Sequence, residues 1–147
     1  MKQAIRALMC VPLLALAAAA QAQTTPVGLW KTIDDKTGKE RSLVRITEAG
    51  GVLSGRIEKR LDPDAKADDV CDKCTDDRKG KPIAGMEIIR GAKKVDGESH
   101  WEGGQILNPE EGKLYRLRLK PVDGGKKLEV RGFIGPFYRN QQWIRVE

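Results

Sequence analysis

Cys71 and Cys74 carry the clearest chemical signal in this sequence, and only Asp72 and Lys73 separate them. Two thiols at this spacing can form a disulfide, act as a redox pair or supply half of a zinc site. We favour the disulfide, because an N-terminal export signal described below removes Cys10 and leaves these two cysteines in an oxidising compartment. The ring is small, so the bond is expected to shape its loop more than to stabilise the fold.

Redox and metal chemistry find less support around this pair. Four aspartates surround the cysteines and disfavour the thiolate that redox chemistry requires: Asp69, Asp72, Asp76 and Asp77. Zinc would need two further ligands, and His100 is the only imidazole in the sequence, which leaves aspartate oxygens as the other candidates. We predict no metal site and no cofactor, with zinc kept as an open alternative.

The sequence also shows no recognisable combination of catalytic residues. His100 stands beside Trp101, and no recognisable nucleophile motif lies near it. The paired carboxylates Glu110 and Glu111 fall in a turn-like stretch, where solvation explains them. We therefore expect a protein that is not an enzyme and has no catalytic residues.

The first 22 residues have the organisation of a secretory signal peptide. Lys2 and Arg6 precede an apolar run over residues 7–20, and Ala20-Gln21-Ala22 is a small-x-small cleavage signature. We predict cleavage after Ala22, a periplasmic or secreted location, and one domain over residues 23–147. No later segment has the roughly 20 apolar residues that a membrane-spanning helix needs.

The charge of the exported chain is modest. The formal charge of +6 falls to +4 when the two cations Lys2 and Arg6 are removed, and the remaining cations are mixed with acids. No basic stripe interleaved with aromatic residues is present, so nucleic acid is not an expected partner. A solvated basic face is the simpler interpretation, and attraction to anionic lipid headgroups or cell-wall polymer is the alternative.

The exported chain alternates short apolar runs with turn residues, which is typical of an antiparallel sheet. In the run over 52–60, Leu53, Gly55 and Ile57 share one face, and Arg56 and Arg60 share the opposite, charged face. Further strands are expected over 28–33, 41–47, 127–134 and 139–146, with a central hairpin over 101–120 that turns between Pro109 and Gly112. Residues 82–89 fit a helical turn or a short strand equally well. We predict an all-β fold, a small antiparallel barrel of about eight strands, with a sandwich as the rival.

Gly28-x-Trp30 and Trp143-x-Arg145 stand near the two ends of the exported chain. Lipocalin-type barrels characteristically carry a Gly-x-Trp at the start of the first strand and an Arg on the last strand, and this chain resembles that arrangement. The resemblance implies that Gly28, Trp30 and Arg145 close the base of the barrel, with the guanidinium stacked on the indole.

A second resemblance covers nearly the whole exported chain. Its most distinctive block is Trp101-x-Gly103-Gly104-x-Ile106, followed by Pro109-x-x-Gly112-Lys113-x-Tyr115. Together with the cysteine pair and Val130-Arg131-Gly132, this block is similar to the bacterial exported family known as domain of unknown function 2147. Asn108 departs from the aspartate usual before the proline. The resemblance implies a periplasmic lipocalin-like barrel and no established activity.

We expect the barrel to bind a small apolar or amphipathic molecule in its mouth, because barrels of about eight strands can hold one such ligand. The candidate ligand-binding residues are four aromatic side chains and one cation: Trp101, Tyr115, Phe133, Trp143 and Arg131. The alternative is an envelope interaction protein that docks an unknown protein partner through the long polar loop over 62–81 and binds no ligand.

Overall fold

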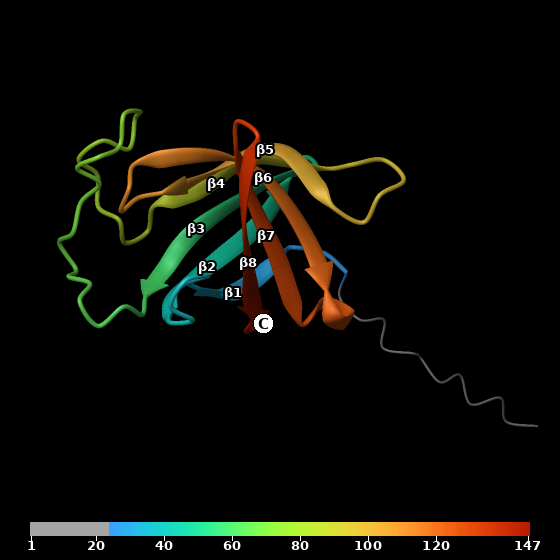
Figure 1. Ribbon diagram of the computed structural model, residues 1–147, viewed down its shortest axis with the longest axis horizontal. Helices are drawn as coiled ribbons and strands as arrows, with labels where there is room; N and C mark the ends of the chain where they lie inside the picture. Colours follow the sequence, from blue (N-terminus) through green and yellow to red (C-terminus); the bar gives the residue numbers. More distant parts are fainter. Residues whose placement is uncertain (1–23) are drawn as a thin grey trace, which may run out of the picture.

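The computed structural model describes residues 24–147, so the predicted signal peptide over residues 1–22 and its cleavage site lie outside the described residues. Eight antiparallel strands form one closed barrel in simple chain order, and β1 pairs with β8 to complete it (Figure 1). The strands are β1 Gly28–Ile33, β2 Glu40–Ala49, β3 Val52–Arg60, β4 Glu87–Lys94, β5 Trp101–Asn108, β6 Lys113–Val122, β7 Lys127–Ile134 and β8 Phe137–Arg145. A short 3-10 helix, η1, spans Asp123–Gly125. The expected all-β barrel is confirmed.

Strand alternation sends one set of apolar side chains into the barrel. The interior is formed by a continuous cluster that includes Val44, Ile46, Leu53, Leu119 and Leu128, all buried. Residues 82–89 resolve into a turn followed by the start of β4, so the short strand is the correct alternative there. None of the helices in the described part of the chain is long and apolar enough to cross a membrane.

The base of the barrel is closed by Trp30 and Arg145. The Arg145 guanidinium carbon lies 4.1 Å from the centroid of the Trp30 ring. Its nitrogens donate hydrogen bonds to the carbonyl oxygens of Gly125, Val27 and Thr25 at 2.6, 2.9 and 2.7 Å. Burial lowers the pKa of this guanidinium from its ordinary value.

Gly28 is required at the same corner for a steric reason. Its φ of +143° is rarely adopted by other residues, and a Cβ atom there would lie 2.6 Å from Nη1 of Arg145. The three residues that the lipocalin resemblance assigned to closure therefore lie together at one end of the barrel.

Two β-bulges change the expected alternation at the other end. Thr32 pairs with Ser42 and Ile33 pairs with Glu40, so Arg41 is an extra residue in β2. Glu58 is likewise extra in β3, because Val44 pairs with Ile57 and Leu43 pairs with Lys59.

The second bulge overturns one expectation from the sequence. Arg60 was expected on the charged outer face, but the bulge pairs it with the inward-facing Ser42 and turns it toward the mouth of the barrel.

The long loop between β3 and β4 is folded onto the barrel. The disulfide between Cys71 and Cys74 is present, as predicted, and an isolated bridge pairs Val70 with Pro82. The loop buries both cysteines together with Ile83 and Met86 in the main core. Arg78, only 6% exposed, donates from Nη1 to the carbonyl oxygen of Glu87 at 2.9 Å. The loop is therefore part of the folded unit, at the left of Figure 1.

Candidate functional site

A cavity of about 170 Å³ lies inside the barrel at the end opposite Trp30 and Arg145. Its wall takes residues from each connection at that end: Asp34 after β1, Ile83 before β4, Glu110 after β5 and Arg139 near the start of β8. The cavity therefore occupies the mouth of the barrel.

The inner part of the cavity is apolar. Its surface is formed by isoleucines and other large side chains from five strands and the β3–β4 loop: Ile57, Ile83, Ile88, Ile106, Val130 and Trp143. Most of these side chains are buried. A hydrocarbon group placed here would lose its contact with water, which is favourable.

Polar groups interrupt the apolar wall on β1, β2 and β8. The hydroxyls of Thr32 and Ser42 are hydrogen-bonded to each other at 2.9 Å. Nε1 of Trp143 donates to Oε1 of Gln141 at 2.9 Å. Thr32 Oγ1 also accepts from the backbone N–H of Ser42 at 3.0 Å, whereas the oxygens of Ser42 and Gln141 each keep a lone pair for a ligand that carries a donor.

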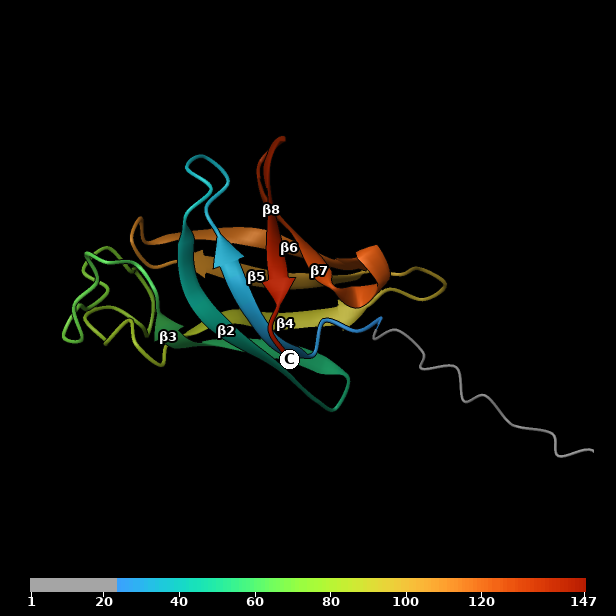
Figure 2. The same cartoon turned by 90° about the horizontal axis from the view of Figure 1, so that it is seen from below.

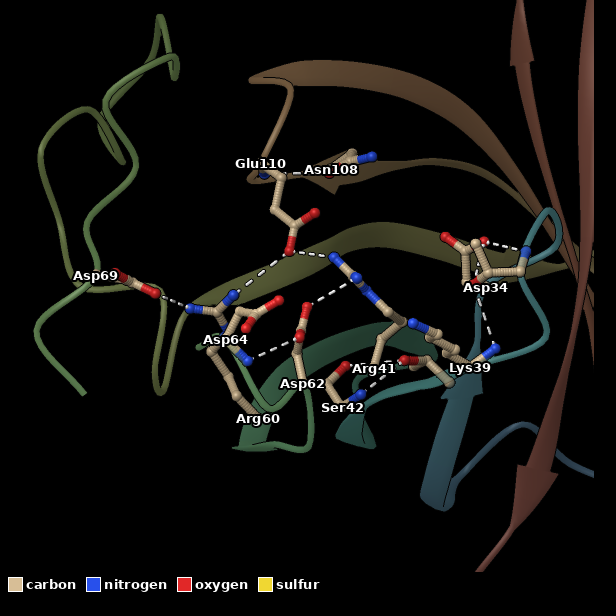
Figure 3. Close-up of polar contacts among 12 residues, drawn as sticks. Asp34, Lys39, Arg41, Ser42, Arg60, Asp62, Asp64, Asp69, Asn108 and Glu110 are labelled. Atoms are coloured by element: carbon tan, nitrogen blue, oxygen red, sulfur yellow. Dashed lines mark hydrogen bonds and ion pairs between the residues drawn. The ribbon is translucent and has the colours of Figure 1, made fainter. Parts of the chain in front are cut away.

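Arg41 and Arg60 stand at the rim, on the two bulged strands. Arg41 pairs with Asp62 at 2.8 Å, and Arg60 pairs with Asp69 at 2.7 Å. The carboxylate of Glu110 accepts from both arginines and so bridges them across the mouth (Figure 3). Hydrogen bonds from the Lys66 backbone and from Arg60 hold the pKa of Asp69 below its ordinary value.

The ion pairs connect three separate parts of the chain. Arg41 and Arg60 belong to the barrel wall, Asp62 and Asp69 belong to the β3–β4 loop, and Glu110 belongs to the β5–β6 turn. A second, more open hollow lies between loop residues 64–72 and the same ion pairs. The pairs therefore form a charged partition between the cavity and the loop.

Every charge of this partition has a partner within the chain, and the partition carries one more carboxylate than guanidinium groups. Its two arginines face three carboxylates, and Arg60 is the most buried member with a side chain only 14% exposed. Glu110 is 46% exposed and stands on a tight turn, so it is the member that can move at least cost. An incoming polar group would meet Glu110 first.

Asp35 and Arg139 form a further ion pair beside the mouth. Nη2 of Arg139 lies 2.6 Å from Oδ1 of Asp35, which joins the β1–β2 loop to β8. The hydrogen bonds from Arg139 hold the pKa of Asp35 below its ordinary value. This pair tethers two hairpins that flank the cavity.

The cavity includes two of the five residues predicted to bind a ligand. Tyr115 and Trp143 line it, and the Tyr115 hydroxyl lies 3.1 Å from a carboxylate oxygen of Glu111. Trp101 does not line it: this residue pairs with Leu119, nearer the base, and its ring lies under the Lys94 ammonium.

The other two predicted residues, Arg131 and Phe133, point to the outside of the barrel. Val130 and Gly132 line the cavity, and alternation along β7 turns their neighbours outward. Arg131 stacks on Tyr138 at 4.6 Å, and Phe133 lies between Arg116 and Arg118. The assignment of these two side chains to the mouth is therefore corrected.

Sequence reasoning missed the rim residues Arg41, Arg60 and Glu110. The bulges that aim the two arginines have no sequence signature, and Glu110 was interpreted as a solvated turn residue. A signal was available in Ser42 and Gln141, because each is a polar residue at an inward position next to buried apolar ones. Such positions indicate an interior that is not packed solid.

No group of three or more His, Cys, Asp or Glu side chains within residues 24–147 is placed to hold a metal ion. His100 lies away from the mouth, with Nε2 at 3.1 Å from Oε1 of Glu102. The two cysteines are joined in the disulfide, which is the form that an oxidising compartment favours.

Comparison with known proteins establishes the family. The profile of a family described as uncharacterized proteins conserved in bacteria, domain of unknown function 2147, matches residues 28–145. The chain belongs to this family. Among solved structures, it is similar to protein HP1028 from the human pathogen Helicobacter pylori, described as a member of the lipocalin family. That match has a TM-score of 0.69 and 21% identity and covers 82% of each chain, so it shows a shared fold. No curated protein matches the chain.

Proposed function

We propose that this protein is a periplasmic binding protein, not an enzyme, which holds a small amphipathic molecule in the mouth of the barrel. The observation that carries the proposal is the cavity of about 170 Å³, with its apolar interior and its charged rim. A molecule with a hydrocarbon part and a polar head matches both surfaces.

The size of the cavity limits the hydrocarbon part. An apolar cavity of about 150 Å³ holds one benzene ring, so the interior here takes roughly six to eight carbon atoms. Longer chains would extend through the mouth, past Glu110 and Tyr115.

The rim favours an uncharged polar head. Arg41 and Arg60 already have carboxylate partners, so an anionic head would have to displace Glu110, and a cationic head would compete with the arginines for the same carboxylates. A hydroxyl or amide head can instead add hydrogen bonds to the existing network.

The competing function, partner docking through the 62–81 loop, receives less support. That loop packs both of its cysteines against the barrel, Val70 is its one large apolar side chain that is exposed, at 38%, and its exposed charges are acidic and basic in equal number. The loop therefore has a structural reason for its length that does not require a partner.

The first experiment is native mass spectrometry of the protein purified from periplasm, beside a denatured sample. A mass excess that disappears on denaturation would reveal the bound molecule. The second is titration with octanoate, 1-octanol and octylamine, which share one tail and differ in the head. The readout is the Trp143 indole N–H signal in a proton–nitrogen NMR spectrum, since this group lines the cavity.

We expect 1-octanol to shift the Trp143 signal at the lowest concentration. Val130→Phe should abolish the shift by filling the interior, and Ile144→Phe on the outer face of β8 is the matched control that should retain it. If none of the three probes moves the signal, or if Val130→Phe binds as the natural protein does, the proposal is wrong.

A further inference from the structure

The tip of the β7–β8 hairpin exposes the largest apolar side chains on the described surface. Phe137 is 72% exposed, Tyr138 is 58% exposed and Ile134 is 45% exposed. All three flank the turn at Gly135 and Pro136, and the hairpin projects from the barrel in the same direction as the β1–β2 hairpin (Figure 2). Such a concentration of exposed apolar area marks an interaction site.

Folding does not explain these side chains. Gly132 on β7 and Arg139 on β8 are paired, and they are the residues nearest the tip that line the cavity. The next pair on the same face, Ile134 with Phe137, lies closer to the tip. The tip therefore extends past the barrel wall, where no core is available to it. On the other face, Tyr138 pairs with Phe133 at 6.1 Å between ring centroids, still in contact with solvent.

Arginines surround the aromatic residues of this hairpin. The guanidinium carbons of Arg116 and Arg118 each lie 5.6 Å from the Phe133 ring centroid, and that of Arg131 lies 4.6 Å from the Tyr138 centroid. Arg118 and Arg131 are direct cross-strand partners, an arrangement of like charges that costs stability. Glu102 and Glu129 neutralise part of this charge, at 2.5 and 3.6 Å.

We propose that the β7–β8 hairpin docks the protein on a membrane surface that contains anionic lipids. Phenylalanine and isoleucine at the tip enter the boundary of the acyl chains, tyrosine lies at the level of the headgroups, and the arginines contact lipid phosphates. The inference does not depend on the identity of the cavity ligand.

A bilayer suits this surface better than a protein partner does. The exposed parts of the three side chains amount to roughly 300–400 Å², about half of what each partner buries in a stable protein complex. A membrane requires no matching shape and adds attraction from many lipid charges at once, so a small apolar tip with a basic surround is sufficient.

Docking in this way would place the cavity at the membrane. Arg139 and Gly132, which line the cavity, are the residues next to the tip on each strand. An amphipathic molecule leaving the bilayer would therefore meet the mouth directly.

The test is sedimentation of the protein with vesicles of phosphatidylcholine alone or with about one third phosphatidylglycerol. We expect binding to the anionic vesicles that weakens with salt. Full burial of one large apolar side chain is worth roughly ten- to a hundredfold in affinity, so Phe137→Ser with Tyr138→Ser should lower binding at least tenfold. Arg116→Gln should lower it about fivefold.

Matched controls use exposed residues elsewhere on the barrel. Ile144→Ser with Val146→Ser removes exposed apolar side chains near the base, and Lys59→Gln removes an exposed cation on β3. Both variants should bind as the natural protein does. Every substituted residue is exposed, so the melting temperature of each variant should change little. Thermal melting therefore serves as the check on folding.

A direct readout of insertion is available through Phe137→Trp. The natural tryptophans Trp30, Trp101 and Trp143 are buried, so a blue shift of emission on vesicle addition, with quenching by brominated lipid, would come from position 137. Absence of binding to anionic vesicles, equal losses in the control variants, or capture of a protein by the hairpin with no vesicle binding would each overturn the proposal.

Discussion

Replacing Arg145 by alanine tests the account of barrel closure most sharply. The guanidinium donates three hydrogen bonds to carbonyl oxygens and stacks on Trp30. A hydrogen bond from a charged donor contributes about 1.5–3 kcal/mol, and the cation–π contact adds about 0.5–1 kcal/mol. The low end of these ranges sums to about 5 kcal/mol, and water can reach part of this corner in the variant, so we expect a smaller loss of about 4 kcal/mol in the free energy of unfolding.

This loss is large compared with the total stability of a domain, which is about 5–15 kcal/mol. The assay is urea unfolding followed by tryptophan fluorescence. With an m-value of about 2 kcal/mol/M, the midpoint should fall by about 2 M. Arg145→Lys keeps the charge but not the planar fork of donors, so it should recover only part of the loss.

The matched control is Arg45→Ala, on the outer face of β2. Arg45 also donates three hydrogen bonds, to Glu58 and Glu147, but its side chain is 37% exposed. Exposed ion pairs contribute about 0–1 kcal/mol, so the midpoint should hardly move. Equal losses in the two variants, or a loss below about 1 kcal/mol for Arg145→Ala, would refute the reasoning.

Three further predictions concern the β3–β4 loop. Gly112→Ala should loosen it, because φ is +67° and the added Cβ would lie 2.0 Å from a loop carbonyl oxygen; faster amide hydrogen exchange in the loop is the measurement, and unchanged exchange would contradict it. Hydrogen bonds from Arg78 lower the pKa of Asp76 from 3.8 to about 2, so its contribution is present above about pH 4 and is lost as the pH falls toward 2. Loop exchange should rise over that range, and Asp76→Asn should flatten the pH dependence. Reduction of Cys71–Cys74 should cost about 2 kcal/mol or less, measured by urea unfolding with and without reductant, because the ring is short.

The outward position of Phe133 shows why the ligand-site prediction succeeded only in part. Successive side chains of a barrel strand point alternately to the interior and to the surface, so the direction of an aromatic side chain follows from that of its neighbours. In β7, Val130 and Gly132 point inward, and Phe133 next to Gly132 therefore points outward. Tyr115 and Trp143 stand at inward-facing positions of their strands, so they line the cavity. The type of side chain alone did not separate these cases.

The sequence by itself determined the kind of fold. Period-two alternation and turn residues at hairpin spacing predict an antiparallel sheet, because each is a local consequence of backbone sterics and side-chain type. The resemblance of Gly28-x-Trp30 and Arg145 to lipocalin-type barrels implies that this sheet closes. The disulfide could also be predicted, since removal of the expected signal peptide leaves two cysteines close together in the sequence and no other thiol with which they could pair.

The character of the mouth was decided only by the tertiary structure. Bulges in β2 and β3 turn Arg41 and Arg60 toward the cavity, and a bulge depends on how two strands pair, which neither strand specifies alone. Glu110 acquires its bridging role because closure of the barrel brings the β5–β6 turn opposite β2 and β3. These contacts join residues 50 or more positions apart, and such distances are set by the complete fold and not by any local pattern.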